Sequence, residues 1–246
     1  VAGDGAAAGA GGSAVAGASG AGGAASGVAR RSSAADLWCD RETAELAQRP
    51  DICIQLSELA FVRQIGHGAS ARCYEARWAG DASSVAVKVA SAGSVSLWKA
   101  EVAHLERLRH PNIISMLGVV VAPPTFCLVL EYCPGGDLCE ACHRPTPPGF
   151  FLRVARGVAS GMSYLHRKGI LHRDLKSANI LLDATYQPKL IDFGTATDGV
   201  TNQPQRRGAL TAETGTYRWM APEVILHEAY SKPADVFSFG MVLYEL

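Results

Sequence analysis

The most suggestive stretch for chemistry is the polar segment around Asp174, which gathers a carboxylate, an ammonium group and an amide within a few residues. Asp174 could accept a proton from a hydroxyl group, and Asn179 could offer an oxygen ligand to Mg²⁺. Lys176 could hold an anionic substrate beside them. Asp192 brings another oxygen ligand on a later turn. Together these side chains predict a site for an anionic substrate and a hard cation, whereas either group alone also fits an ordinary polar loop.

A second set of residues could place phosphate oxygens beside that segment. Gly66 and Gly68 lie between two expected strands, where a backbone without side chains can approach phosphates, although glycines at such places are more often only a turn. Lys88 ends an alternating strand. Glu101 follows on a helix whose other inward residues are apolar, and a lone carboxylate there is costly unless it is paired. The sequence therefore predicts that Lys88 pairs with Glu101 and reaches phosphate oxygens.

The elements that must position these residues begin with an antiparallel sheet and one helix. Strands are expected at Leu59–Gln64, Arg72–Trp78, Ser84–Ala90, Met116–Val121 and Phe126–Glu131. A helix is expected at Ser96–Arg109, with an inward face made of Leu97, Glu101, Leu105 and Leu108. A short helix is also expected upstream of the sheet, at Asp36–Arg49.

The second half of the chain has a helical pattern. An amphipathic helix is predicted by the stripe Phe151, Ala155, Val158, Met162 and Leu165, and Gly169 ends it. Two short apolar runs follow, at Ile180–Leu182 and Lys189–Ile191. The last segment, Asp235–Leu246, is apolar nearly all round, as is typical of a helix buried in a larger structure. With nothing behind it, and with Val1 in place of an initiator Met, we expect a longer gene product and an exposed apolar patch on this chain.

Composition narrows the classes of protein. The chain has 246 residues with 23 Lys+Arg and 23 Asp+Glu, so no net basic field attracts nucleic acid or an anionic membrane. Its uncharged runs do not read as membrane spans. Seven cysteines, an odd number, and no signal peptide favour a reducing compartment, the cytoplasm. Residues 1–29 are low-complexity Ala, Gly and Ser, which predicts a flexible tether or a segment without function.

The order of these segments resembles a eukaryotic protein kinase over about Leu59 to Leu246. The segments that carry the resemblance are Gly66-His67-Gly68-Ala69-Ser70-Ala71, Val85-Ala86-Val87-Lys88, Glu101, His172-Arg173-Asp174-Leu175-Lys176-Ser177-Ala178-Asn179, Asp192-Phe193-Gly194 and Ala221-Pro222-Glu223. Residues Gly215–Glu223 are similar to the tyrosine-kinase-like group, such as mixed-lineage kinases. Lys176 resembles Ser/Thr kinases. The implied fold is α+β and two-lobed, with a tether over 1–50, a small β lobe over 51–132 and an incomplete helical lobe over 133–246.

The resemblance implies transfer of the ATP γ-phosphoryl group to a Ser or Thr hydroxyl of a protein substrate. Asp174 would orient and deprotonate that hydroxyl, and Lys176 would steady the γ-phosphate. Lys88, paired with Glu101, would contact the other phosphates. Asn179 and Asp192 would hold Mg²⁺. The residues implied around the nucleotide are Ile65, Gly66, His67, Gly68, Ala71, Cys73, Ala86, Lys88, Glu131, Cys133, Asp137 and Leu182.

Two departures from the family pattern keep an alternative open. Ala71 stands where the third loop glycine is expected, and Cys73 stands where a valine packs on adenine. They motivate a pseudokinase-like nucleotide-binding scaffold as the alternative to an active kinase. Regulation by an upstream kinase is a further expectation, with Thr211 and Thr214 as candidate phosphosites that Arg173 could bind.

One segment matches a different chemistry. Cys139-Glu140-Ala141-Cys142-His143 fits the string that attaches c-type haem. Such a short string matches many chains by chance, no signal peptide accompanies it, and no further ligand for zinc is evident. We therefore expect two reduced thiols on a short helix.

Overall fold

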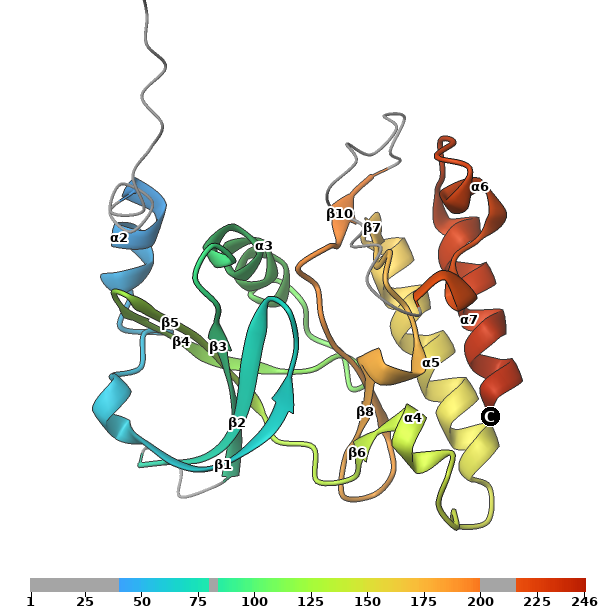
Figure 1. The fold of residues 1–246 in the computed structure, drawn as a ribbon, viewed down its shortest axis with the longest axis horizontal. Coiled ribbons are helices and arrows are strands. Elements are labelled where there is room, and N and C mark those ends of the chain that lie inside the picture. Colours follow the sequence, from blue (N-terminus) through green and yellow to red (C-terminus); the bar gives the residue numbers. More distant parts are fainter. Residues whose placement is uncertain (1–39, 80–83, 200–215) are drawn as a thin grey trace, which may run out of the picture. The chain divides into compact units, whose positions relative to one another are not determined.

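The computed structural model describes residues 40–79, 84–199 and 216–246, all within the compact unit Ser33–Leu246 (Figure 1). The predicted tether over 1–29 and the candidate phosphosites Thr211 and Thr214 lie outside the described residues. No helix in the described ranges combines the length and the apolar character that a membrane span requires. The predicted domain boundaries at 50 and 132 remain predictions.

The helix predicted at Asp36–Arg49 is present in its described part as α2, Arg41–Ala47. Asp40 begins it, because its side chain accepts a hydrogen bond from the backbone N–H of Thr43 at 2.9 Å. Thr43 is buried, which shows that this short helix lies against the rest of the unit.

The predicted antiparallel sheet is confirmed as a five-stranded sheet in the order β1-β2-β3-β5-β4. Its strands are β1 (Leu59–His67), β2 (Ala71–Trp78), β3 (Ser84–Ala90), β4 (Met116–Ala122) and β5 (Thr125–Glu131). Strand β1 runs beyond its predicted end, because Gly66 and His67 stay paired with Cys73 and Arg72 of β2. The glycine segment is therefore the closed end of a strand pair.

Helix α3, Val95–Leu105, is the longer of the two described helices beside this sheet (Figure 1). The prediction that Leu97 faces the core is wrong, since Leu97 is 43% exposed. The buried residues of α3 are Val95, Trp98, Glu101, Val102, His104 and Leu105. Glu101 and Leu105 are buried as predicted, and the face differs only at its start, where Trp98 rather than Leu97 enters the core beside Phe126 of β5. The helix also ends earlier than predicted, and Leu108 is buried beyond it.

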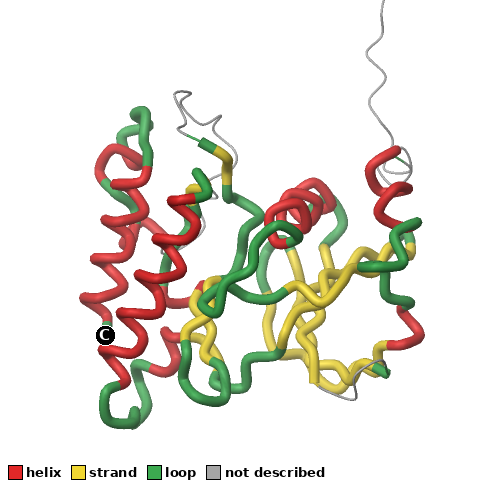
Figure 2. Tube along the Cα trace, turned by 180° about the vertical axis from the view of Figure 1, so that it is seen from behind, coloured by secondary structure: helices red, strands yellow, loops and turns green. Residues whose placement is uncertain are grey.

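The second half of the described chain is mainly helical, and Figure 2 shows its helices gathered away from the strands of the sheet. Its elements are β6 (Gly136–Asp137), α4 (Leu138–Ala141), α5 (Phe150–Arg167), β7 (Ile170–Leu171), β8 (Ile180–Leu182), β9 (Pro188–Leu190), β10 (Thr197–Asp198), α6 (Pro222–Ile225) and α7 (Lys232–Glu245). Strands β6, β8 and β9 form a small sheet of three strands.

Helix α5 is confirmed, but the predicted stripe is wrong at its start, because Phe151 is 50% exposed. The buried side begins at Phe150 and Val154 instead. Two buried glycines belong to it. A Cβ atom on Gly157 would lie 2.4 Å from Pro188 Cγ, and one on Gly161 would lie 2.8 Å from Leu190 Cδ1. The backbone of α5 therefore approaches β9 as closely as only glycine allows.

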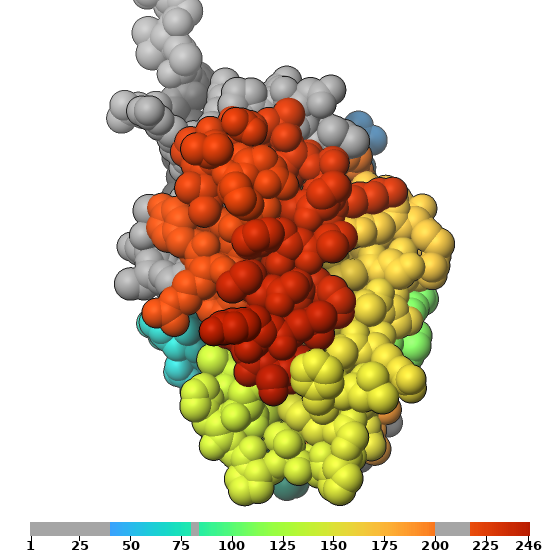
Figure 3. Space-filling model, turned by 90° about the vertical axis from the view of Figure 1, so that its right-hand side faces the viewer, coloured from blue at the N-terminus to red at the C-terminus, as the bar shows by residue number. Residues whose placement is uncertain are grey.

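Helix α7 is confirmed, and apolar side chains on it are exposed, as expected from its all-round apolar pattern. Val236 is 58% and Tyr244 is 86% exposed. Figure 3 shows α7 in red at the surface of this face. Its buried residues are Ala234, Asp235 and Val242. Asp235 is the charged residue among these buried positions, and its contacts are described with the site below.

A continuous apolar core links the sheet with the helical half. It includes Trp98 and Val102 of α3, Leu128 of β5, Val158 of α5 and Val242 of α7. The predicted site residues carried by the sheet and by the helical half are therefore positioned through one core.

Candidate active site

The segment that carries Asp174 is fixed by a carboxylate from α7. Asp235 accepts the backbone N–H of His172 at 3.0 Å and that of Arg173 at 2.9 Å. Arg173 has φ +72, a conformation that residues other than glycine rarely adopt. Such a conformation persists only where surrounding contacts hold it, and here both N–H groups are held by one buried side chain.

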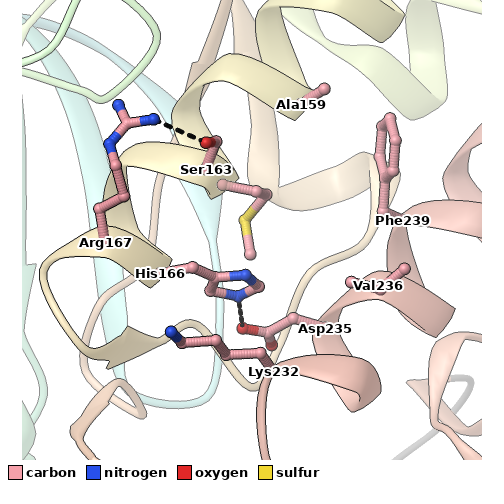
Figure 4. A pocket seen from close by; sticks show the side chains of 9 residues that line it. Ala159, Ser163, His166, Arg167, Lys232, Asp235, Val236 and Phe239 are labelled. Atoms are coloured by element: carbon pink, nitrogen blue, oxygen red, sulfur yellow. Dashed lines mark hydrogen bonds and ion pairs between the residues drawn. The ribbon is translucent and has the colours of Figure 1, made fainter.

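His166 completes this support from α5, with its Nε2 atom 2.8 Å from Asp235 Oδ2 (Figure 4). Burial opposes the charge of Asp235, but the hydrogen bonds from His166 and from the backbone hold its pKa below the usual value. Both side chains also line a pocket of about 360 Å³ between α5 and α7, which none of the predicted nucleotide contacts lines. The sequence interpretation missed both residues, although Asp235, a carboxylate opening an apolar helix, was a usable signal.

Two of the predicted catalytic residues, Asp174 and Lys176, lie together on this segment with Asn179, a predicted metal ligand. Lys176 Nζ lies 2.9 Å from Asp174 Oδ2, and Asn179 Nδ2 donates to the same oxygen at 2.8 Å. A second bond from Asn179 Nδ2 reaches the backbone carbonyl of Asp174 at 2.7 Å. Because the amide nitrogen of Asn179 is used in this way, its side-chain oxygen is the atom left for a cation.

The predicted pair of Lys88 and Glu101 is confirmed. Lys88 Nζ lies 2.7 Å and 2.9 Å from the two carboxylate oxygens of Glu101, and 3.2 Å from Asp192 Oδ1. The side chain of Glu101 is only 5% exposed. Burial opposes the charge of Lys88, but the carboxylates of Glu101 and Asp192 outweigh it and raise the pKa of Lys88. The ammonium group therefore stays charged and joins β3, α3 and the segment after β9.

Asp192 lies where these two groups of residues meet. Its φ is +67, a second strained position in the site. Burial opposes its charge, but Lys88 and then His172 and Lys176 lower its pKa, so the carboxylate remains ionised. The backbone also ties this region to Asn179, whose carbonyl accepts the N–H of Ile191 at 3.0 Å. An ionised carboxylate and an amide oxygen suit Mg²⁺, with phosphate and water oxygens as the remaining ligands.

The glycine segment tolerates its departures from the family pattern. Gly68 N–H donates to the carbonyl of Ala71 at 2.9 Å, and Ala71 is not among the residues of the described chain with positive φ. Alanine is therefore unstrained at this position. Cys73 pairs with Lys88 in the register of β2 and β3. Burial raises the pKa of Cys73, so this thiol is neutral and acts as a small apolar side chain.

The other predicted nucleotide contacts are spread over three strands and the segment after β5. Ile65 is 38% exposed on β1, Ala86 pairs with Leu130 across β3 and β5, and Leu182 is fully buried in β8. Cys133 is buried just after β5, where burial first of all raises the pKa of its thiol to about 12. The register of the five-stranded sheet places Cys73 opposite Lys88 and Gly66 opposite Cys73.

Two predicted contact residues use their carboxylates elsewhere. Glu131 forms an ion pair with Lys189 of β9 at 2.9 Å and accepts the N–H of Ser115 at 2.7 Å. Asp137 accepts the N–H of Glu140 at 2.8 Å and so caps α4. Any contact from Glu131 to a nucleotide would therefore use its backbone, and Asp137 would use its remaining oxygen.

The Cys139–His143 segment forms a short helix and a turn, and the ring of His143 is engaged by the backbone. Its residues form α4 and the turn after it, and His143 Nδ1 lies 2.8 Å from the carbonyl oxygen of Cys139. Across the described ranges there is no group of three or more His, Cys, Asp or Glu side chains placed to hold a metal ion.

Fold and site together define a protein kinase domain, and comparison with known proteins agrees. The Protein kinase domain family matches residues 59–246. The chain therefore belongs to the protein kinase family.

Several relatives share this region. The chain is 39% identical over 202 residues to "Serine/threonine-protein kinase STY46" of Arabidopsis thaliana, covering 78% of this chain and 34% of that protein. It is 37% identical over 216 residues to "Serine/threonine/tyrosine-protein kinase HT1" of Arabidopsis thaliana, covering 82% and 54%. It is 35% identical over 204 residues to "Mitogen-activated protein kinase kinase kinase 13-A" of Xenopus laevis, covering 82% and 20%. The chain thus spans a fifth to about half of these relatives. The resemblance to the tyrosine-kinase-like group is confirmed.

Proposed function

We propose that this protein is a serine/threonine protein kinase that transfers the γ-phosphoryl group of ATP to a protein hydroxyl. The observation that carries the proposal is the partly buried cluster in which Lys88 joins Glu101 and Asp192, next to the Asp174–Asn179 segment. Three parts of the chain converge there, and each contributes a side chain of the type that phosphoryl transfer needs. The printed names of the relatives support the same activity.

In the proposed reaction the substrate hydroxyl oxygen attacks the γ-phosphorus atom. The bond to the β,γ-bridging oxygen breaks, ADP leaves, and the hydroxyl proton passes to the carboxylate of Asp174. Lys176, already 2.9 Å from Asp174, neutralises charge on the transferred group. Lys88 donates to the remaining phosphates while Glu101 holds it in place. Positioning and charge neutralisation therefore supply most of the catalysis.

Asn179 and Asp192 would hold Mg²⁺, which supplies positive charge beside the phosphates when it is bound. The lowered pKa of Asp192, which arises because Lys88 outweighs its burial, keeps this ligand anionic. The acceptors are proposed to be Ser or Thr residues of protein substrates.

Regulation by an upstream activating kinase is part of the proposal. Arg173 lies against Tyr230, with its guanidinium carbon 5.4 Å from the ring centroid, and its Nη1 atom donates to the carbonyl of Thr195 at 3.3 Å. From there it could meet a phosphate on the segment that includes Thr211 and Thr214. The proposed location is the cytoplasm, where the six described cysteines, all free thiols, would stay reduced.

The test is phosphate incorporation by the full-length protein from labelled ATP into a protein substrate. Asp174→Asn and Lys88→Met should each lower incorporation at least about 100-fold. Lys168→Met is the matched control, since Lys168 is an exposed lysine after α5 and should change little. Equal incorporation by wild type and all variants contradicts the assigned roles. Binding of ATP without incorporation in wild type indicates the pseudokinase-like scaffold instead.

A further inference from the structure

The segment Asp40–Ile54 lies upstream of the residues 59–246 that match the kinase family, yet it is part of the same compact unit. Its helix α2 lies beyond the edge of the sheet formed by β4 and β5, as Figure 1 shows. The segment contacts the edge strand β4 and helix α3. Since α3 carries Glu101, what the segment does to α3 bears on the site.

The segment is seated firmly on the sheet. Cys53 pairs in parallel with Val119 of β4. The N–H of Ile54 donates to the carbonyl of Val119, and the N–H of Val119 donates to the carbonyl of Ile52, both at 2.8 Å. A Cβ atom on Gly118 would lie 2.5 Å from the carbonyl oxygen of Ile52. The segment thus adds to the free edge of the sheet at a place where only glycine lets it fit.

From this seat the segment reaches α3 at two points. Lys99 of α3 forms an ion pair with Asp40, and its Nζ lies 3.7 Å from a carboxylate oxygen of Glu42. Arg49 forms an ion pair with Glu106, the residue that ends α3. The side chain of Lys99 is only 12% exposed, so this contact is better shielded from solvent than an ordinary surface pair.

The two contacts fall on one side of the helix. Lys99, Val102 and Glu106 follow the spacing of a single helical stripe. Carboxylates meet Lys99 at one end of the stripe, and a guanidinium meets Glu106 at the other. Opposite charges at the two ends favour one register of α3 against the segment, because a shifted helix would lose both pairs. Glu101 projects from the neighbouring face to Lys88 on β3.

We propose that the segment Asp40–Ile54 is a positioning element that braces α3 against the sheet and so keeps Glu101 within reach of Lys88. Asp40 and Arg49 are its positioning residues, and they act through Lys99 and Glu106. The inference rests on the proposed function, which gives the Lys88–Glu101 pair its role at the phosphates.

The test uses Glu106→Arg and Lys99→Met in the full-length protein, with two readouts. Amide hydrogen exchange along α3 should become about fivefold faster, and kcat/KM for ATP should fall about fivefold. Exchange along α5 should stay unchanged. Glu106→Arg is informative because a cation at the C-terminus of a helix favours the helix itself. Faster amide exchange in that variant would therefore result from the lost contact with Arg49 and not from a weaker helix. Arg49 also pairs with Asp51 at 2.7 Å, so the rescue variant combines Arg49→Glu, Glu106→Arg and Asp51→Asn, and it should restore both readouts.

Glu45→Gln is the matched control. Glu45 lies on α2 and pairs with Arg41 on the same helix, both well exposed. Unchanged α3 exchange in Glu106→Arg and Lys99→Met, an equal effect of Glu45→Gln, or failure of the rescue variant to restore α3 would overturn the proposal. A wild-type protein without phosphate incorporation refutes the proposed function instead, and α3 exchange then decides the brace alone.

Discussion

At the scale of single residues, the site depends on carboxylates that are held by specific partners. Burial raises the pKa of Glu101, and the pairing with Lys88 opposes that shift. Lys88 also pairs with the half-buried Asp192, and His166 and backbone N–H groups hold the buried Asp235. A buried carboxylate without such partners would be protonated or would destabilise the fold. Removing one partner should therefore cost more than removing an exposed charge.

Asp235→Asn should lower the free energy of unfolding by about 3 kcal/mol. The aspartate accepts hydrogen bonds from His166 and two backbone N–H groups through two anionic oxygens, whereas asparagine has a single neutral oxygen to accept them. Urea denaturation measures this difference. The exposed Glu228 provides the control, and Glu228→Gln should change the unfolding free energy by less than about 0.5 kcal/mol. Similar losses in both variants would show that Asp235 is not an anchor.

The same residue predicts a pH dependence. Its pKa is lower in the folded state than in the unfolded state, so its stabilising contribution is complete above the unfolded value of about 4. That contribution is lost as the pH falls through the lower folded value. The difference in unfolding free energy between wild type and Asp235→Asn should thus shrink below about pH 4. Urea titrations from neutral to acidic pH measure it, and a constant difference would contradict the pKa assignment.

At the scale of elements, helices hold their side chains in place through close backbone approaches as well as apolar stripes. Helix α5 meets β9 at Gly157 and Gly161, where added Cβ atoms would overlap Pro188 and Leu190. Strand β9 leads directly to Asp192. The approach of α5 to β9 therefore sets where the end of that strand, and the carboxylate after it, can lie.

Gly157→Ala should destabilise the protein by about 1–3 kcal/mol, because the overlap outweighs the better helix propensity of alanine. Gly240→Ala in α7 is the matched variant, since a Cβ atom there meets nothing within 4 Å. It should stabilise the protein by up to about 1 kcal/mol. Thermal unfolding of both variants checks this pair of opposite signs, and the same sign in both would contradict the packing argument.

At the scale of the whole described unit, one apolar core connects the sheet that carries Lys88 with the helices that support Asp174. The segment Asp40–Ile54 adds a further connection, from the sheet edge to α3. A nucleotide bound at Lys88 and Asp192 would contact both halves and should stabilise them together.

Saturating ATP with Mg²⁺ should raise the unfolding temperature by several degrees, since a ligand at about 100 times its Kd contributes about 2.7 kcal/mol. Removing Mg²⁺ with a chelator should abolish most of this shift. Asp192→Asn should lose the part that depends on Mg²⁺, because a proposed ligand carboxylate is gone. Asp183→Asn, on the turn between β8 and β9, should keep it. Thermal shift assays on wild type and both variants measure these shifts, and a full Mg²⁺ effect in Asp192→Asn would exclude that residue as a ligand.

Much of this could be predicted from the sequence, because local patterns carry it. Alternation and turn residues predicted the strands, and motif order predicted the family. The Lys88–Glu101 pair followed from a simple argument, since a lone carboxylate among apolar neighbours needs a cation. The errors at Leu97 and Phe151 have one cause: two adjacent apolar residues leave the orientation of a helix face ambiguous by one position.

The chemical types and their order along the chain thus settled the class of protein, because strands, turns and motifs are short-range features. Only the tertiary structure decided the long-range partners: Asp235 beneath Arg173, β9 against Gly157, and the upstream segment on β4 and α3. Such contacts join residues far apart in sequence, and their specificity lies in close packing and matched hydrogen-bonding groups. No local pattern encodes that matching, so it appears only when the folded surfaces meet.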